Sequence, residues 1–157
     1  MPIVLYRVDD RLVHGQVVIG WGRSNDVGFV ALVDDAVAAS DWERELYRMG
    51  VPPEVELFFA SIADAARQMD AWRSDARNGM VLTADISTMV ALAEAAPPVD
   101  RVNLGGIHHK PGRTQRLPYI YLTEEEYRIL ESLAARGTQV TAQDLPTSSP
   151  VPLEQLR

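Results

Sequence analysis

Short apolar runs alternate with helical patterns along almost the whole chain, and no other feature constrains the fold as strongly. Strands that alternate with helices of about 10–15 residues are typical of βαβ units and a parallel sheet. We therefore predict an α/β fold with a single open, mainly parallel sheet and helices on both faces. The predicted strands are Ile3 to Val8, Gly28 to Val33, Glu54 to Phe59, Met80 to Thr83, Arg101 to Leu104, Tyr119 to Leu122 and Thr138 to Ala142. The predicted helices span about 16–24, 40–49, 61–76, 85–96 and 123–136, and the order and direction of the last two strands stay open.

Local signals mark where several of these helices begin and end. Ser40 stands three residues before Glu43, which is the spacing of a capping box. Thr123 precedes three glutamates, which lie favourably at the positive end of a helix dipole. Pro97-Pro98 follows a third helical pattern and is expected to end it.

The length of the chain, 157 residues, favours one domain. We assign residues 1–145 to this domain and residues 146–157 to a C-terminal tail. From Leu145 the sequence reads Leu-Pro-Thr-Ser-Ser-Pro-Val-Pro, which is too rich in proline for a long regular element. We expect the tail to wrap the surface or to be loose.

The composition excludes several classes of protein. The chain has no cysteine, which excludes a thiolate nucleophile, disulfides and zinc sites that use sulfur. Its net charge of −7 argues against nucleic-acid binding, which needs a positive surface. No apolar run approaches the roughly 20 residues that cross a bilayer, and no basic leader precedes the first apolar run. We expect a cytoplasmic protein that does not itself insert into the membrane.

A polar loop follows the first predicted strand. Open parallel sheets bind their ligands outside the carboxyl ends of their strands, so this loop stands where such a protein keeps its chemistry. A predicted helix begins after it, at about Gln16, and would offer unpaired N–H groups to an anion. The polar and flexible residues of the loop are Asp9, Asp10, Arg11, His14 and Gly15.

His14 is the candidate nucleophile of this loop. A neutral imidazole attacks phosphorus near neutral pH while a hydrogen bond at its other nitrogen fixes the tautomer. Arg11 supplies a planar fork of donors for phosphate oxygens, and Gly15 lets the backbone bend toward an anion. The plain alternative is a surface histidine at a helix start. Asp9 and Asp10 point in opposite directions on an extended backbone, so one can orient Arg11 or His14, or each can bond its own backbone.

A second loop, residues 105–118, is longer than an ordinary connector and contains Gly105-Gly106. It overlaps the segment from Arg101 to Arg116, which has four basic residues, two histidines and no acid. In an acidic chain this segment is the natural place for an anion or an acidic partner surface, with Lys110 and Arg113 as docking candidates. Because both loops follow carboxyl ends of strands, we expect them at the same edge of the sheet.

Other kinds of site find little support. Adjacent histidines such as His108-His109 more often bind nothing than bind a metal, and no supporting ligand motif accompanies them. No G-x-G-x-x-G, Walker sequence or G-x-S-x-G elbow occurs. We predict no metal and no cofactor. Trp21, Trp42 and Trp72 lie in helical patterns and are expected to pack in the core.

The segment from Arg7 to Val17, Arg-Val-Asp-Asp-Arg-Leu-Val-His-Gly-Gln-Val, resembles the active-site segment of IIB components of mannose/fructose/sorbose-type phosphotransferase systems (PTS). The resemblance continues from Val102 to Ile107 and from Gly112 to Gln115, and it resumes from Ala134 to Gly137. It covers about residues 1–145. The first segment is highly specific, and the later ones are supportive.

This resemblance implies a phosphotransferase, a protein-Nπ-phosphohistidine–sugar phosphotransferase. Such proteins take a phosphoryl group from a phosphohistidine on a IIA component and pass it to a sugar held by membrane-embedded IIC and IID partners. The phosphorylated histidine matches His14, with Nδ1 as the accepting nitrogen, and the loop arginine matches Arg11. Through its partners the protein would be held at the inner face of the membrane. The supporting candidates are Asp9, Asp10, Gly15, Gln16, Gly105 and Gly106.

Two alternatives stay open. The same His14 would serve a regulatory phosphocarrier of an incomplete phosphotransferase system that transports no sugar. A non-catalytic α/β module would instead bind a small anion at residues 9–15. Adjacent genes for IIC and IID proteins would support transport, and phosphate on His14 would separate either carrier from the binding module.

Overall fold

A seven-stranded sheet forms the centre of the molecule, with strand order β3-β2-β4-β1-β5-β8-β9. The computed structural model describes residues 3–157, except for the side chain of Gln16. In this sheet every neighbouring pair is parallel except β8 and β9. The predicted α/β class with a mainly parallel sheet is therefore confirmed. The strands are β1 (Ile3–Val8), β2 (Val27–Val33), β3 (Glu56–Ala60), β4 (Asn78–Thr83), β5 (Arg101–Leu104), β6 (Thr114–Leu117), β7 (Ile120–Leu122), β8 (Gln139–Ala142) and β9 (Val151–Pro152).

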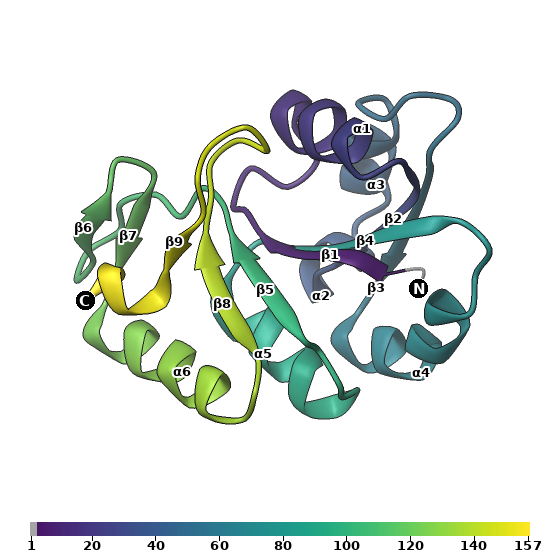
Figure 1. Cartoon of the computed structure of the whole chain (residues 1–157). Helices are drawn as coiled ribbons and strands as arrows, with labels where there is room; N and C mark the ends of the chain where they lie inside the picture. Colours follow the sequence, from purple (N-terminus) through teal and green to yellow (C-terminus); the bar gives the residue numbers. More distant parts are fainter. Residues whose placement is uncertain (1–2) are drawn as a thin grey trace.

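Helices cover both faces of this sheet, as predicted. In Figure 1, α1 and α3 lie above the sheet, whereas α4, α5 and α6 lie below it. None of the helices in the described part of the chain is long and apolar enough to cross a membrane. The helices are η1 (Gln16–Trp21), α1 (Gly22–Ser24), α2 (Asp35–Ala38), α3 (Asp41–Arg48), α4 (Ile62–Arg73), α5 (Ile86–Ala95), α6 (Glu124–Ala135) and η2 (Leu153–Leu156).

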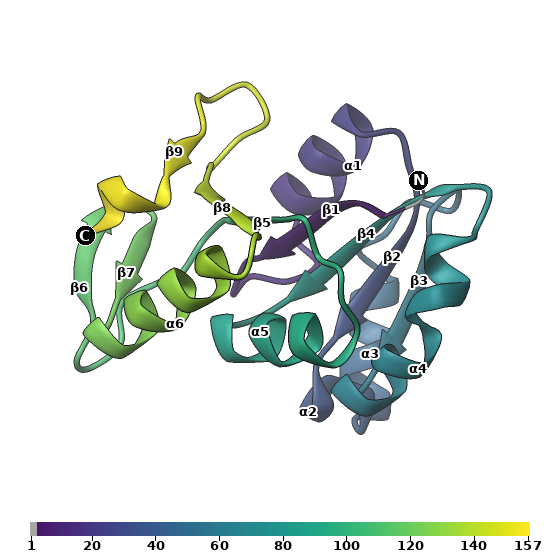
Figure 2. The ribbon, with the colours of Figure 1, turned by 60° about the horizontal axis from the view of Figure 1, so that its bottom comes forward.

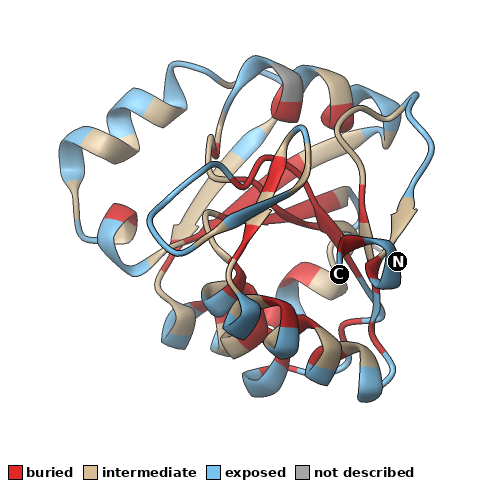
Figure 3. Cartoon of the chain, turned by 90° about the vertical axis from the view of Figure 1, so that its left-hand side faces the viewer, coloured by how far each residue is buried: buried red, intermediate tan, exposed pale blue. Residues whose placement is uncertain are grey.

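The central strands supply an apolar core to each face of the sheet. Successive side chains of a strand point to opposite faces. In β2, Phe29, Ala31 and Val33 join the cluster on the side of α4 and α5, while Val30 and Leu32 join the cluster on the side of η1. A strand that is buried on both faces reads as a continuous apolar run, which is why the sequence pattern predicts it well. Figure 3 shows buried residues along the interior strands and exposed residues along the outer sides of the helices.

The predicted helix starts are confirmed by their caps. The Ser40 hydroxyl accepts a hydrogen bond from the backbone N–H of Glu43 at 3.4 Å. Thr123 and Glu126 form a complete capping box, in which each side chain accepts from the backbone N–H of the other residue, at 3.0 and 2.9 Å. These bonds satisfy N–H groups that a helix cannot pair internally.

The C-terminal tail is more ordered than the expectation of a surface wrap or a loose end. Strand β9 pairs with β8, and Leu153 and Leu156 of η2 are buried in the larger core. The Arg116 guanidinium donates to the carbonyl of Leu156 at 2.9 Å, which ties the chain end to the β6–β7 hairpin. Figure 2 shows the C-terminus beside this hairpin. The proline content of the tail did not reveal the two buried leucines.

One of the three tryptophan predictions is wrong. Trp21 and Trp72 are buried, but Trp42 is 69% exposed. On α3 the contact with the core comes from Tyr47. Five residues at about 100° each place Trp42 about 140° around the helix from Tyr47, so it faces solvent.

Candidate functional site

The two predicted loops meet at the carboxyl-terminal edge of the sheet, as expected, because β1 and β5 are neighbours. The backbone N–H of Asp10 donates to the carbonyl of Gly106 at 2.8 Å. Close by, the N–H of Gly105 donates to the carbonyl of Val8 at 2.7 Å. The backbone at the end of β1 is thus bonded to the backbone that follows β5.

Asp9 organises the first loop from a fully buried position. Its carboxylate accepts hydrogen bonds from Nε of Arg11 at 2.9 Å, from Nη2 of Arg11 at 2.8 Å and from the Arg11 backbone at 3.1 Å. Nη2 of Arg7 donates to the same carboxylate at 3.2 Å. Burial alone would raise the pKa of Asp9, but the hydrogen bond from Arg11 and the charge of Arg7 hold it below its usual value. Of the roles considered for Asp9, its contacts match both orienting Arg11 and bonding the local backbone.

Arg7 lies behind Asp9 and is a site residue that sequence reasoning missed. Its side chain has no exposed surface. It donates to Oδ1 of Asn103, to the carbonyl of Gln143 at 3.0 Å and to the carbonyl of Asp144 at 3.3 Å. Its guanidinium also lies 4.4 Å from the centre of a Trp21 ring. A signal was present, since a charged residue in an apolar strand, two positions before an acid, shares a face with that acid.

The two glycines after β5 allow this cluster to pack closely. A Cβ atom at Gly105 would lie 2.5 Å from Cζ of Arg7 and 2.6 Å from Oδ2 of Asp9, so these side chains or the loop backbone would have to shift to admit it. At Gly106 a Cβ would lie 3.2 Å from Nε of Arg11. The backbone of the second loop is therefore pressed against the charged side chains of the first.

Arg11 is held as an oriented cation, with its side chain 24% exposed. The hydrogen bond to Asp9 raises the pKa of Arg11 above its ordinary value. Nη2 of Arg11 also lies 4.0 Å from Oδ1 of Asp144, in the segment that follows β8. Nothing in the local sequence pattern indicates that this segment reaches the loop.

His14 is exposed and lies two residues before η1, and its carbonyl accepts from the N–H of Val18 at 2.9 Å. The bend in the loop comes from Leu12, which is buried and has a φ of +54°. Gly15, which was expected to let the backbone bend toward an anion, has a helical φ of −51° that any residue adopts. The side chain of the supporting candidate Gln16 lies outside the described residues.

The side chain of Asp10 contacts the second loop. Its Oδ2 accepts from the backbone N–H of His108 at 2.8 Å, and its Oδ1 lies 2.7 Å from Nδ1 of His108. Asp9 and Asp10 therefore have separate partners and form no dyad, as expected.

The basic segment from Arg101 to Arg116 does not form one continuous patch. Arg101 begins β5, at the sheet edge away from both loops. Nε and Nη2 of Arg113 donate to the carboxylate of Glu126 at 3.0 and 2.7 Å, and only 9% of the Arg113 side chain is exposed. Lys110 is exposed near the site. Of the two docking candidates, Lys110 is the one on the surface.

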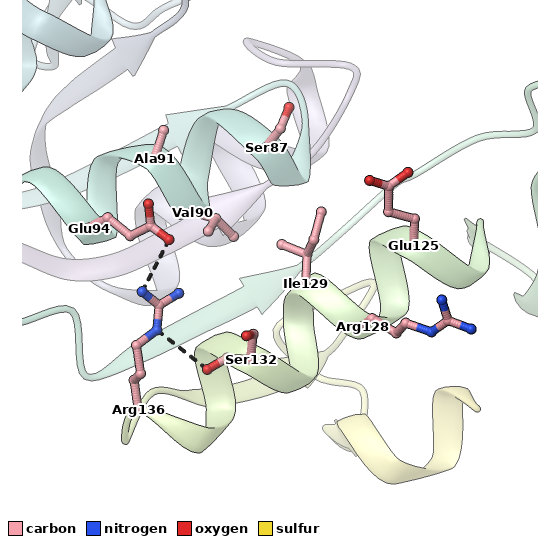
Figure 4. Close-up of a pocket in the computed structure, with 9 residues that line it drawn as sticks. All are labelled: Ser87, Val90, Ala91, Glu94, Glu125, Arg128, Ile129, Ser132 and Arg136. Carbon is pink, nitrogen blue, oxygen red and sulfur yellow. Dashed lines mark hydrogen bonds and ion pairs between the residues drawn. The ribbon is translucent and has the colours of Figure 1, made fainter.

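A separate groove of about 450 Å³ lies between α5 and α6 (Figure 4). Its lining mixes apolar side chains with polar and charged ones, and Nη1 of Arg136 lies 3.1 Å from Oε1 of Glu94 across it. None of the described residues that line it belongs to either loop. Within residues 3–157, leaving aside the Gln16 side chain, no three His, Asp or Glu residues gather as a metal site would require.

Comparison with known proteins identifies the family. Residues 3–157 match the model of the family described as "PTS system sorbose subfamily IIB component". The PTS fructose-specific EIIB component of Bacillus subtilis (strain 168) is 28% identical over 149 residues, which cover 95% of this chain and 91% of that protein.

Two further similarities agree with this match. The PTS mannose-specific EIIAB component of Escherichia coli (strain K12) is 29% identical over 147 residues, which cover 94% of this chain and 46% of that protein. This chain therefore spans about half of the mannose-specific protein. The crystal structure of the PTS N-acetylgalactosamine-specific IIB component 1 from Escherichia coli has a TM-score of 0.88 at 25% identity, covering 95% of this chain and 97% of that chain. Because the family model matches nearly the whole sequence, the resemblance noted above is confirmed, and the chain belongs to the sorbose subfamily of PTS IIB components.

Proposed function

We propose that His14 accepts a phosphoryl group at Nδ1 from the phosphohistidine of a IIA protein and passes it to a sugar held by membrane IIC and IID partners. The observation that carries this proposal is that one loop holds both an exposed His14 and Arg11, whose guanidinium is held in a fixed direction by buried Asp9. Membership of the IIB family supports the same reaction.

The chemistry suits these residues. In the first step a bond forms between Nδ1 of His14 and phosphorus while the N–P bond of the donor breaks, and in the second step a sugar hydroxyl oxygen replaces Nδ1. Such transfers pass through a loose transition state, so the protein mainly positions groups and stabilises charge on the equatorial oxygens. Arg11 supplies the positive charge, and Asp9 with Arg7 behind it keeps that charge in place.

The exposure of His14 is consistent with a carrier. A phosphoryl group that is received from one protein and delivered through another has to be reached by both, which favours a surface loop over a closed pocket. The name of the E. coli relative, EIIAB, pairs an A with a B component, in keeping with a IIA protein as the donor.

Labelling tests the proposal. The chain is incubated with phosphoenolpyruvate, the general phosphotransferase proteins and a IIA partner, and incorporation of acid-labile phosphate is measured. Wild type and His109→Ala should be labelled, and folded His14→Ala should not. Acid-labile phosphate retained by His14→Ala would refute the assignment. Delivery of the label to a sugar then requires vesicles that contain the IIC and IID partners.

A further inference from the structure

The second loop presents a histidine that is both exposed and oriented. The His108 side chain is 60% exposed, yet its Nδ1 lies 2.7 Å from Oδ1 of Asp10 and its backbone N–H donates to Oδ2 of the same carboxylate at 2.8 Å. A carboxylate only accepts hydrogen bonds, so Nδ1 carries a proton. Nε2 is then the nitrogen left to act on a ligand.

The backbone of His108 is held from behind as well. Nη1 of Arg113 donates to the His108 carbonyl at 2.9 Å. The other donors of Arg113 are fixed on Glu126, whose carboxylate also caps α6. An exposed side chain ordinarily loses rotamer freedom when it binds a ligand, but here ring and backbone are ordered in advance. Such preorganisation is typical of a side chain that acts on a ligand.

The ring of His108 also stands beside Arg11. The position that a Cβ of Gly106 would take lies 3.2 Å from Cε1 of His108 and 3.2 Å from Nε of Arg11. Cε1 of His108 and Nε of Arg11 therefore face the same glycine, so the imidazole lies on the side of the guanidinium to which we assign the phosphoryl oxygens. No comparable arrangement holds His109, whose ring packs at 5.7 Å from that of Tyr121.

We propose that His108 is a second ligand of the phosphoryl group, with Asp10 as its positioning residue: in the ring form that bears a proton on both nitrogens, Nδ1 bonds Asp10 and Nε2 donates to a phosphoryl oxygen on the side of Arg11. This inference rests on the proposed function of His14. The charged groups around the ring are Asp10 on the first loop, Arg11 beside it and the dianionic phosphoryl group itself. His108 forms no covalent bond in this role, and phosphorus stays on His14 until it is delivered.

Two amide variants separate the two ring nitrogens. In His108→Asn the side-chain amide takes the place of Nδ1 and still reaches Asp10, but nothing replaces Nε2. In His108→Gln the amide reaches the place of Nε2, and the bond to Asp10 is lost. The rate of transfer from phosphorylated IIA to His14 is measured by rapid quench, with His109→Asn as the matched control. Melting temperatures confirm that each variant is folded.

Loss of one charge-assisted hydrogen bond is expected to slow transfer about 10- to 100-fold in His108→Asn. His108→Gln should retain more activity than His108→Asn, and His109→Asn should match wild type. A wild-type rate for folded His108→Asn would overturn the inference and leave His108 as a clamp between the loops. Equal losses in His108→Asn and His109→Asn would also overturn it. Absence of phosphate from His14 in wild type would instead refute the proposed function, so the two failures are distinguishable.

Discussion

Substitution of Gly105 by alanine tests how closely the backbone of the second loop packs against Arg7 and Asp9. In Gly105→Ala the new Cβ would overlap the guanidinium of Arg7 and lie 2.6 Å from Oδ2 of Asp9. Arg7 has no exposed surface and is held by the carbonyls of Gln143 and Asp144, so it has no room to swing aside. The methyl group therefore has to displace the buried ion pair or the backbone of the second loop.

The size of the effect follows from these contacts. Extra volume in a packed interior costs about 1–3 kcal/mol, and disrupting a buried ion pair about 3–5 kcal/mol. Because the pair would be displaced and not removed, we expect Gly105→Ala to lower the free energy of unfolding by about 3 kcal/mol. In a chain of this size that corresponds to a fall of about 6–12 °C in Tm. Transfer to His14 should fall as well, since Asp9 orients Arg11.

Gly15→Ala is the matched control for stability. A Cβ at Gly15 would meet nothing within 4 Å, and the helical φ suits alanine, so the free energy of unfolding should stay within about 1 kcal/mol of wild type. Both variants are unfolded in urea and followed by circular dichroism, with midpoints compared at equal slope. If Gly105→Ala proves as stable as Gly15→Ala, the close packing of Arg7 and Asp9 is not what stabilises this edge.

Three further predictions concern the charges of the site. Arg11→Lys should slow transfer by about 10-fold or more with unchanged circular dichroism, because lysine lacks the fork that bonds Asp9 through two nitrogens; a wild-type rate would remove Arg11 from the mechanism. Lys110→Glu should lower the second-order rate of transfer from IIA and make that rate less dependent on salt, whereas an unchanged salt dependence would place docking elsewhere. Arg113 is unsuited to this test because it forms an ion pair with Glu126. Burial opposes ionisation of Glu126, but its bonds to Arg113 hold the pKa of this carboxyl below its usual value. The stability that the ionised carboxylate contributes should therefore be present above about pH 4 and be lost as the pH falls through the folded-state pKa. Urea midpoints of Glu126→Gln should fall less with acid than those of wild type, and identical profiles would contradict this.

The parallel sheet and the position of the site were predictable from local patterns. Residues 29–33 read as a continuous apolar run because they are buried on both faces of the sheet. The loops at 9–15 and 105–118 were expected at one edge because parallel strands end together there, and the backbone bonds from Asp10 to Gly106 and from Gly105 to Val8 confirm it. Strand order was not needed for this expectation, only strand direction.

The contacts around Arg7 were not predictable in the same way. Its partners Asn103, Gln143 and Asp144 come from β5 and from the segment after β8, and nothing in residue spacing shows that these segments meet behind β1. The difference between His108 and His109 has the same origin, because it depends on which of them Asp10 reaches.

Two other features depend on long-range packing that local patterns do not show. Leu153 and Leu156 are buried because the β6–β7 hairpin and α6 stand beside them, and a short proline-rich tail does not show this by periodicity. Trp42 is exposed because α3 contacts the core through Tyr47. Hydrophobic character alone did not distinguish the inner from the outer side of so short a helix.

The identity of the phosphorylated atom tests the central claim most directly. The chain is labelled with nitrogen-15 in its histidines, phosphorylated through the IIA partner and kept at alkaline pH, and the phosphorylated nitrogen is identified by NMR and the residue by peptide mapping. We predict one phosphoryl group, on Nδ1 of His14. A phosphoryl group on His108 or His109 would contradict the assignment of His14 as the carrier. So would the absence of any phosphoryl group after incubation with a IIA partner that is itself phosphorylated.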